Sequence, residues 1–415
     1  MKNIDKNIRQ TVKNNLCISC GICEGICPVK AIKAVGKGKM VIDKNCTNCG
    51  LCKSYCPGLH SGISIEDNVY VQMSGKVEKS YVGRTKDRKI LNNAVSGGVV
   101  TQLALILLQK NIYDYVLGIR NTCFNKENHM EVYSYQSYSE DYQKSVYTMP
   151  SYAKAVRFII ENPNKKIIII GSGCVISAVK KYLLKNGETD KYLFIGLFCD
   201  CTLNNNIEKY FQRYAKGTKI TITGLQYRSK EGRGWPGDLK LLFNEKYIMI
   251  PREERYKVVP YFRNERCIYC IDHMNVNSDI SVGDNYTGIH ADKLGSNSIV
   301  VRTKKGLDVM QLAENKLSLY DIDYNIILES QNIKVKEKNY IYSKILKKKK
   351  NIDINIEKCN SDLHFGEKEY KELKTILRKL KKGRKYIPFL FDIYVLIKGD
   401  SNLYNRLSVK RKLEN

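Results

Sequence analysis

Residues 17–28 read CISCGICEGICP and residues 46–57 read CTNCGLCKSYCP, so the cysteine spacing C-x2-C-x2-C-x3-C-P occurs twice near the start of the chain. In each copy the first three thiolates can wrap one face of an iron–sulfur cube, whereas the fourth cysteine lies too far along to close it. The fourth cysteine is therefore expected to ligate the cluster of the other copy. Zinc suits this spacing poorly, because zinc sites favour two separated cysteine pairs.

The spacing predicts a small α+β ferredoxin-like domain over residues 1–65 that holds two [4Fe–4S] clusters. The ligands expected for cluster 1 are Cys17, Cys20, Cys23 and Cys56. The ligands expected for cluster 2 are Cys46, Cys49, Cys52 and Cys27. Clusters of this kind carry single electrons, so the pattern predicts one-electron transfer.

The composition limits what kind of protein this is. The chain has 415 residues, 43% of them hydrophobic, which is enough for two or three domains with ordinary cores. Its net charge of +28 suggests an anionic partner, but no recognised nucleic-acid-binding module accompanies that charge, and nucleic acid is not expected. The N-terminus is polar, and no apolar run approaches a membrane helix of about 18 residues. We therefore expect a cytoplasmic protein whose fifteen cysteines bind metal rather than form disulfides.

An α/β body with a parallel or mixed sheet is predicted after a linker over residues 66–90. Within it, strand-like runs at 166–170 and 192–198 alternate with helix-like stretches at 175–185 and 204–214. We divide this body into an N-terminal part, residues 91–160, and a C-terminal part, residues 161–325.

Four further cysteines fall at informative places in the body. Cys174 follows the first predicted strand and Cys199 ends the second, while Cys267 and Cys270 form another C-x2-C pair. If the two strands are parallel neighbours, both thiols emerge at the sheet edge where α/β proteins bind ligands. The four thiolates can then converge on a third cluster. The alternative is that they are inert core residues, as buried single cysteines commonly are.

A second candidate site is the run Ser96-Gly97-Gly98, which directly precedes a predicted helix over 99–110. Glycines permit close approach to a ligand, and the free N–H groups of a helix start attract phosphate. The alternative is a pair of loop glycines that only caps the helix.

Residues 326–415 differ in character and are predicted to be a basic helical tail. From residue 331 onward there are 23 Lys or Arg against 10 Asp or Glu. One interpretation is a solvated appendage whose removal leaves the cofactors in place. The other is a docking element for an acidic redox protein or, peripherally, for a membrane surface, because basic clusters beside apolar faces bind such partners.

The body resembles the coenzyme F420 hydrogenase/dehydrogenase beta-subunit family. Six motifs in the family's order carry the resemblance, at residues 94–101, 170–174, 196–199, 227–235, 266–270 and 278–284. The resemblance implies a flavoprotein, with FAD as the expected flavin, that exchanges electrons between clusters and a hydride carrier such as coenzyme F420. It also implies a third [4Fe–4S] cluster on Cys174, Cys199, Cys267 and Cys270, with Cys201 as a substitute ligand.

The resemblance further implies a set of cofactor-binding residues, namely Ser96, Gly97, Gly98, Thr101, Gly171, Ser172, Gly173, Arg228, Lys230 and Asp284. The family's usual Phe-Cys-His-Gly is replaced by Phe198-Cys199-Asp200-Cys201, so a proton-transfer histidine is missing there. No catalytic acid or base is identified, and the five histidines are expected to be structural or exposed.

Two functions follow. The first is an iron–sulfur flavoenzyme that connects a one-electron redox protein to a hydride carrier. The second is an electron-relay subunit without its own substrate, which serves a partner oxidoreductase, for example in polysaccharide biosynthesis.

Overall fold

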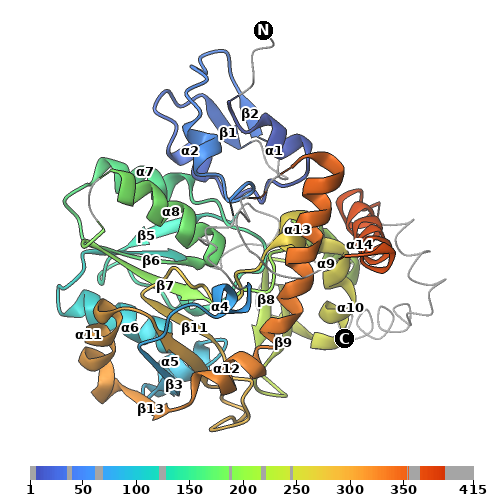
Figure 1. Ribbon diagram of the computed structural model, residues 1–415. Helices are drawn as coiled ribbons and strands as arrows, with labels where there is room; N and C mark the ends of the chain where they lie inside the picture. Colours follow the sequence, from blue (N-terminus) through green and yellow to red (C-terminus); the bar gives the residue numbers. More distant parts are fainter. Residues whose placement is uncertain are drawn as a thin grey trace.

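The computed structural model describes residues 6–34, 40–60, 69–120, 128–186, 189–215, 221–243, 246–352, 354 and 365–387. It shows a small N-terminal module on top of a larger mixed α/β body (Figure 1). The expected α/β class is confirmed, with a larger share of antiparallel strands than the sequence pattern indicated.

The N-terminal module is built from two similar halves around a short antiparallel ribbon of β1 and β2. Its elements are α1 (Arg9–Lys13), α2 (Ile22–Gly25), β1 (Ile32–Ala34), β2 (Met40–Ile42) and α3 (Leu51–Ser54). The short helices α2 and α3 each begin after a left-handed glycine, Gly21 at φ +70° and Gly50 at φ +84°. These glycines occupy the same place in the two cysteine motifs, so the repeat in the sequence is also a repeat in the backbone.

The body contains an eight-stranded sheet in the order β13-β3-β12-β11-β7-β6-β4-β5. Its strands are β3 (Lys79–Thr85), β4 (Tyr115–Ile119), β5 (Met130–Tyr133), β6 (Ile167–Ser172), β7 (Tyr192–Leu197), β11 (Ile280–Asp284), β12 (Asn297–Val301) and β13 (Leu317–Asp321). The central strands β4, β6, β7 and β11 are parallel. The predicted neighbours β6 and β7 do pair in parallel, with Ile170 opposite Ile195.

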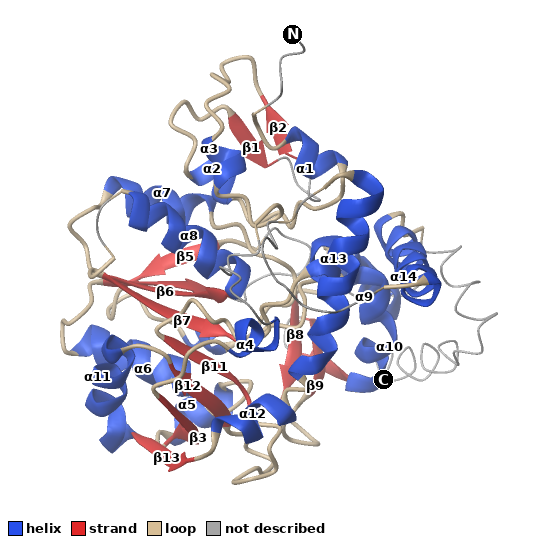
Figure 2. Cartoon of the chain, in the orientation of Figure 1, coloured by secondary structure: helices blue, strands red, loops and turns tan. Residues whose placement is uncertain are grey.

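Helices cover both faces of this sheet (Figure 2). Ile167 and Ile169 face the cluster that contains α7 (Ala153–Glu161) and α8 (Gly173–Lys185). On the opposite face, Ile168 packs with α6 (Val99–Gln109) and α11 (Lys304–Ala313). Because both faces are buried, β6 is an uninterrupted apolar run rather than an alternating one.

A second, three-stranded antiparallel sheet lies beside the large one. It comprises β8 (Gly224–Ser229), β9 (Asp238–Phe243) and β10 (Lys246–Ile250), and it packs with α9 (Asn206–Gln212) and α10 (Arg252–Phe262). Short 3-10 turns add η1 (Glu140–Gln143), η2 (Arg213–Ala215), η3 (Glu265–Tyr269), η4 (Glu314–Lys316) and η5 (Ile333–Val335).

The expected linker over 66–90 is not a linker. It contains α4 (Val69–Ser74), the strand β3 and the start of α5 (Arg88–Asn93), and β3 lies inside the large sheet between β12 and β13. The charged run at 83–89 suggested an exposed linker, but its first residues belong to an inner strand. Arg84 of that strand is partly exposed, and its guanidinium pairs with Asp292 at 2.6 Å.

The basic tail is helical but is not a solvated appendage. Its helices are α12 (Tyr324–Ser330), α13 (Lys336–Lys350) and α14 (Glu367–Arg384). A core cluster joins Tyr342 and Ile345 of α13 to Leu373 of α14 and to Tyr269 of the body. Residues 388–415 of the predicted tail lie outside the described residues. Across the described ranges, no helix combines the length with the apolar character needed to cross a bilayer.

Candidate iron–sulfur and cofactor sites

The four cysteines expected for cluster 1 gather on the side of the N-terminal module that faces the body. Cys20 is affected electrostatically by Cys56 and Cys17, and Cys23 by all three of the others. Burial and the neighbouring thiol of Cys17 raise the pKa of Cys56 to about 11. The backbone N–H of Ser19 donates to Sγ of Cys17 at 3.4 Å, a contact of the kind that tunes cluster potentials.

The four cysteines expected for cluster 2 gather on the outer side of the module. Cys27, Cys46, Cys49 and Cys52 all line one small cavity, together with Asn7 and the turn at Pro28. Cys49 is exposed to solvent, whereas Cys27 and Cys52 are buried. The structure therefore gathers the eight N-terminal cysteines in one module, and their division into two ligand sets stays a prediction.

Five cysteines of the body also lie together. Burial and the neighbouring thiol of Cys270 raise the pKa of Cys174 to about 12. Burial also raises the pKa of Cys199, with further contributions from Cys267, Cys174, Cys201 and Cys270. The four residues that the sequence proposed for a third cluster thus converge on one site at the C-terminal edge of the large sheet. Thiols of this kind lose their protons when they bind metal. The positive charge of the metal then offsets the cost of burying the thiolates.

Hydrogen bonds and packing distinguish the five cysteines. Ser172 Oγ lies 3.4 Å from Sγ of Cys174, and the backbone N–H of Thr202 donates to Sγ of Cys267 at 3.4 Å. Cys201, in contrast, packs against the apolar cluster of the small sheet and lies beside Arg263. Cys201 therefore lies at the periphery of the group. Within the described part of the chain, no three His, Cys, Asp or Glu side chains are placed to hold a single metal ion.

Charged side chains lie next to the inner cysteines, by which we mean Cys174, Cys199, Cys201, Cys267 and Cys270. Lys336 of α13 is 4% exposed and donates to the Asp200 carboxylate at 2.9 Å. Burial alone would raise the pKa of Asp200, but Lys336 and Arg263 outweigh it and hold this pKa well below its usual value. Asn339 of α13 donates to the carbonyl of Cys270 at 2.7 Å. The tail helix α13 is therefore part of the wall of this site.

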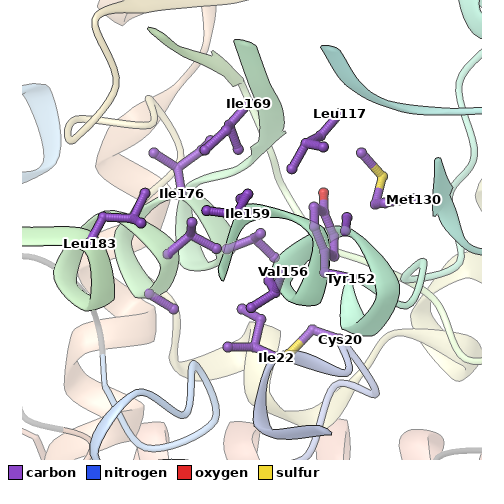
Figure 3. Packing of buried hydrophobic residues seen from close by; sticks show 14 of the residues in the cluster. Cys20, Ile22, Leu117, Met130, Tyr152, Val156, Ile159, Ile169, Ile176 and Leu183 are labelled. Carbon is purple, nitrogen blue, oxygen red and sulfur yellow. The ribbon is translucent and has the colours of Figure 1, made fainter. Parts of the chain in front are cut away.

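The N-terminal module is fixed against the body next to these cysteines. Cys20 and Ile22 pack beneath Val156 and Tyr152 of the body (Figure 3). A side chain at Gly21 would meet Oγ of Ser151 at 2.4 Å, so a glycine is needed for this close approach. Polar contacts add to the packing, because Arg157 donates to the carbonyl of Cys27 at 2.7 Å.

Tyr152 lies between the two groups of cysteines. It is 3% exposed, its N–H donates to the carbonyl of Cys20 at 2.7 Å, and Cys174, Cys20 and Cys199 all affect its phenol electrostatically. Burial is the main reason that the pKa of this phenol is raised. Tyr152 therefore interacts with cysteines of both groups, with Cys20 of the module and with Cys174 and Cys199 of the body.

Arg228 and Asp284 form a buried ion pair farther along the same sheet edge. The guanidinium of Arg228 binds the Asp284 carboxylate in a bidentate manner, at 2.6 and 2.9 Å, and Trp235 Nε1 donates to the same carboxylate at 2.9 Å. Burial alone would raise the pKa of Asp284, but Arg228 lowers it below the usual value. Gln331 donates to the Asp284 carbonyl at 2.7 Å and contacts His273 at 3.3 Å. These contacts connect this pair to the wall of the inner cysteines.

A polar cavity of about 250 Å³ opens beside this ion pair, between the small sheet and the end of α5. Four cationic side chains line it, those of Lys144, Arg228, Lys230 and Lys240, against the single carboxylate of Glu231. Burial and the nearby Arg228 lower the pKa of Lys230 to about 8. The volume lies below the range of pockets that enclose a whole cofactor, so the cavity suits an anionic fragment such as a phosphate.

Several predicted cofactor-binding residues make close packing contacts within the protein. A Cβ at Gly97 would lie 2.6 Å from Oδ1 of Asn297, and Gly98 is the left-handed N-cap of α6 at φ +73°. A Cβ at Gly173 would lie 2.1 Å from the Asp272 carboxylate. Ser96 is 5% exposed and donates to the Ser296 carbonyl at 2.8 Å. The interpretation of the Ser96–Gly98 run as a helix cap is therefore the one that the local contacts favour.

The remaining candidates are divided between the two sites. Gly171 and Ser172 end β6 beside the inner cysteines, where a Cβ at Gly171 would lie 3.0 Å from the Tyr152 hydroxyl. Thr101 lies half-buried in the first turn of α6. Lys230 lines the cavity, although its ammonium also donates to the carbonyls of Leu91 and Ser96 at 2.6 and 2.7 Å.

The four histidines within the described residues, His60, His129, His273 and His290, show no arrangement typical of acid–base catalysis. His273 is mostly buried against Phe198, and burial together with the positive charge of Lys336 lowers its pKa to about 4. His60 contacts the carbonyl of Lys53, and His290 stacks on Tyr320. His129 forms an isolated bridge with Ser151, and His364 lies outside the described residues.

Sequence reasoning missed Tyr152, Lys336 and Asn339 as parts of the sites. Tyr152 belongs to no motif, and its position next to the cysteines depends on how the N-terminal module packs against the body. Lys336 belongs to the basic tail, where nothing in the local sequence distinguishes a buried lysine from its exposed neighbours.

Comparisons with known proteins bear on both parts of the chain. Two family models of the coenzyme F420 hydrogenase/dehydrogenase beta subunit match the body, the N-terminal model at residues 80–155 and the C-terminal model at residues 164–324. Residues 11–33 match the 4Fe-4S binding domain. The F subunit of the F(420)H(2) dehydrogenase of Methanosarcina mazei is 24% identical over 324 residues, which cover 76% of this chain and 87% of that relative.

The fold is similar to that of a solved chain in the F420-reducing [NiFe] hydrogenase complex of Methanosarcina barkeri. The TM-score is 0.52 at 18% sequence identity, and the match covers 69% of this chain and 96% of that one.

Proposed function

Because the chain belongs to the coenzyme F420 hydrogenase/dehydrogenase beta-subunit family and carries a 4Fe-4S binding domain, we propose that it passes electrons between a one-electron redox protein and a hydride carrier. The observation that carries this proposal is the arrangement of the cysteines. Two sets of four in the N-terminal module are followed, across Tyr152, by the inner cysteines at the sheet edge.

In this proposal the cysteines would hold three [4Fe–4S] clusters. The cysteines at the outer side of the module would hold cluster 2, those that face the body would hold cluster 1, and the third cluster would bind Cys174, Cys199, Cys267 and Cys270. The residues present fit such clusters, because each set supplies four cysteine thiols and backbone or hydroxyl donors approach the sulfurs. Cys201 lies at the periphery of the inner group and is left without a ligand role.

We propose that a flavin, FAD, binds at the same sheet edge, beyond the inner cysteines. When bound, flavin accepts two electrons as hydride and releases them one at a time, which is the conversion that this route requires. The residues that support this placement are those of the cationic cavity, with Arg228 and Lys230 facing an anionic group of the cofactor. Arg228, held by Asp284, is fixed in orientation, so it can bind a phosphate without first losing conformational freedom.

The hydride carrier that we propose is coenzyme F420, the compound after which the family and the M. mazei relative are named. The partner would be a redox protein or another oxidoreductase subunit in the cytoplasm, and no nucleic acid is involved. A specific observation also supports the relay function. Ser96, Arg228 and Lys230 are all engaged in internal hydrogen bonds, and the cavity is smaller than a complete flavin.

The experiment that separates the two functions is anaerobic purification followed by iron, sulfide and flavin quantification on one sample. Three clusters correspond to about twelve irons per chain, and the flavoenzyme should also contain about one flavin. Addition of reduced coenzyme F420 should then bleach the cluster absorption. About eight irons, no flavin and no bleaching by reduced coenzyme F420 would favour the relay.

A further inference from the structure

We propose that the outer face of the N-terminal module is the docking surface for an acidic one-electron carrier protein of the ferredoxin type. We define the cluster 2 face as the surface around the exposed Cys49 that carries Lys6, Lys30, Lys44 and Lys53. This inference rests on the proposed function, because it takes cluster 2 to be the entry point of the electron route.

The first argument is accessibility. The opposite side of the module is buried, because Ile18, Ile22 and Tyr55 lie in the core cluster shared with the body. On the cluster 2 side, Cys49 is exposed, and Val29, which lines the same cavity, is 41% exposed. Electron transfer between proteins requires close approach of the two centres, and of the two cysteine sets in the module only this one has a thiol at the surface.

The second argument is charge. Among the described residues of the module, 6–34 and 40–60, every Lys and Arg is exposed: Lys6, Arg9, Lys13, Lys30, Lys33, Lys44 and Lys53. The two carboxylates of the same ranges, Glu24 and Asp43, are half-buried and accept backbone N–H groups at 3.0 and 2.8 Å. The surface is therefore strongly positive, and it attracts an acidic partner.

The third argument is that lysines lie close to the cysteines of cluster 2. Lys6 lies at the cavity rim, because its backbone N–H donates to Asn48 at 3.0 Å and its Cβ lies 3.6 Å from where a Gly50 Cβ would be. Lys53 directly follows Cys52, and Lys30 follows the lining residues Pro28 and Val29. A small apolar centre ringed by charge is the usual anatomy of a transient interface.

The tail was the docking element that the sequence suggested, and the structure favours the module instead. Lys336 of α13 is buried against Asp200, and α14 packs so closely on α10 that a Cβ at Gly383 would lie 1.9 Å from the Tyr261 carbonyl. All of the inner and cluster 1 cysteines are at least partly buried. In the transfer itself, the carrier loses one electron and cluster 2 gains it, with no bond made or broken.

The test uses the full-length, cluster-loaded protein and four charge reversals, Lys6→Glu, Lys30→Glu, Lys44→Glu and Lys53→Glu. The matched control reverses four exposed lysines of α14, at Lys368, Lys374, Lys379 and Lys381, which changes the net charge equally. The probe is a reduced, strongly acidic [2Fe–2S] ferredoxin, and the rate of cluster reduction is followed by stopped flow at low and high ionic strength. Reduced methyl viologen serves as the small reductant.

At low ionic strength the cluster 2 face variant should react with ferredoxin at least about tenfold more slowly than the α14 variant. High salt should reduce this difference in rate, because it screens the charges. Equal rates for the two variants, a larger loss in the α14 variant, or no reaction of the unmodified protein with ferredoxin would overturn the docking proposal. Reduction by viologen distinguishes failure of the docking proposal from failure of the proposed function. If viologen also fails to reduce the clusters of the unmodified protein, the proposed electron route is wrong.

Discussion

The backbone N–H of Tyr152 donates a 2.7 Å hydrogen bond to the carbonyl of Cys20, which joins a proposed cluster ligand of the N-terminal module to the body. The same tyrosine ring lies within electrostatic reach of Cys174 on the other side. One residue therefore interacts with ligands at both ends of the proposed step between cluster 1 and the third cluster.

Tyr152→Ala should lower the free energy of unfolding by about 3–5 kcal/mol, because truncation of a buried aromatic ring leaves a cavity. It should also slow electron transfer between the module and the inner cluster. Tyr152→Phe keeps the ring and loses only a long 3.5 Å hydrogen bond to Ile170, so it should resemble the unmodified protein. Denaturant unfolding and freeze-quench EPR would measure the two effects. A Phe variant as slow as the Ala variant would show that the hydroxyl, not the ring, matters.

Cys174→Ser should remove the third cluster and leave the two clusters of the N-terminal module. The iron content should fall from about twelve to about eight per chain. Cys201→Ser is the matched control, because Cys201 belongs to the same group of thiols but lies at its periphery. It should keep its iron. Unchanged iron in the Cys174 variant, or equal losses in both, would contradict the assignment.

Asp284→Asn should destabilise the fold by about 3–5 kcal/mol, because it leaves the Arg228 guanidinium buried without its charged partner. The side chains of this pair are only 7% and 16% exposed. Asp292→Asn removes the partner of Arg84 in a pair that is 32% and 47% exposed, and it should cost about 1 kcal/mol or less. Thermal unfolding of both variants would compare these two losses of stability. The flavin content of the Asp284→Asn variant would show whether the buried pair also supports cofactor binding.

The affinity of the cationic cavity for an anion should fall as the pH rises through about 8. The pKa of Lys230 is lowered to about 8 by burial and by Arg228, so its positive charge is lost above that pH. Burial and Lys240 also lower the pKa of Lys144, which acts in the same direction. Because the unfolded chain keeps these protons to higher pH, folding stability should instead rise between about pH 8 and the ordinary lysine range.

Calorimetric titration with pyrophosphate at pH 7 and pH 9 would measure this change. The control is Lys230→Arg, which keeps its charge at both pH values and should bind with a weaker pH dependence. An unmodified protein that binds pyrophosphate equally well at both values would show that these lysines do not hold the anion.

Removal of residues 331–415 should prevent stable folding of the inner site, contrary to the interpretation of the tail as an appendage. Lys336 and Asn339 contact Asp200 and Cys270, and Tyr342 and Ile345 belong to the core. If the truncated chain is insoluble, Asn339→Ala gives the finer measurement. It should lower third-cluster occupancy while the N-terminal clusters stay loaded. A soluble truncation with full iron content would restore the appendage interpretation.

The sequence by itself determined the parts that depend on spacing along the chain. The two C-x2-C-x2-C-x3-C-P motifs predict which cysteines share a cube, and the structure places Cys27, Cys46, Cys49 and Cys52 around one cavity, while Cys23 lies near Cys17, Cys20 and Cys56. The apolar runs at 166–170 and 192–198 indicated adjacent buried strands, and β6 and β7 do pair in parallel. Local spacing is enough here because each prediction concerns atoms a few residues apart or the inherent periodicity of a strand.

Only the tertiary structure decided how these parts meet. The position of Tyr152 between Cys20 and Cys174, the burial of Lys336 at Asp200 and the place of β3 inside the sheet all depend on contacts between residues far apart in sequence. A lysine in a basic helix or a charged run at a strand end has the same local sequence whether it faces water or pairs with a carboxylate of the body. Its role is set by the free energy of packing the whole chain, which no short stretch contains.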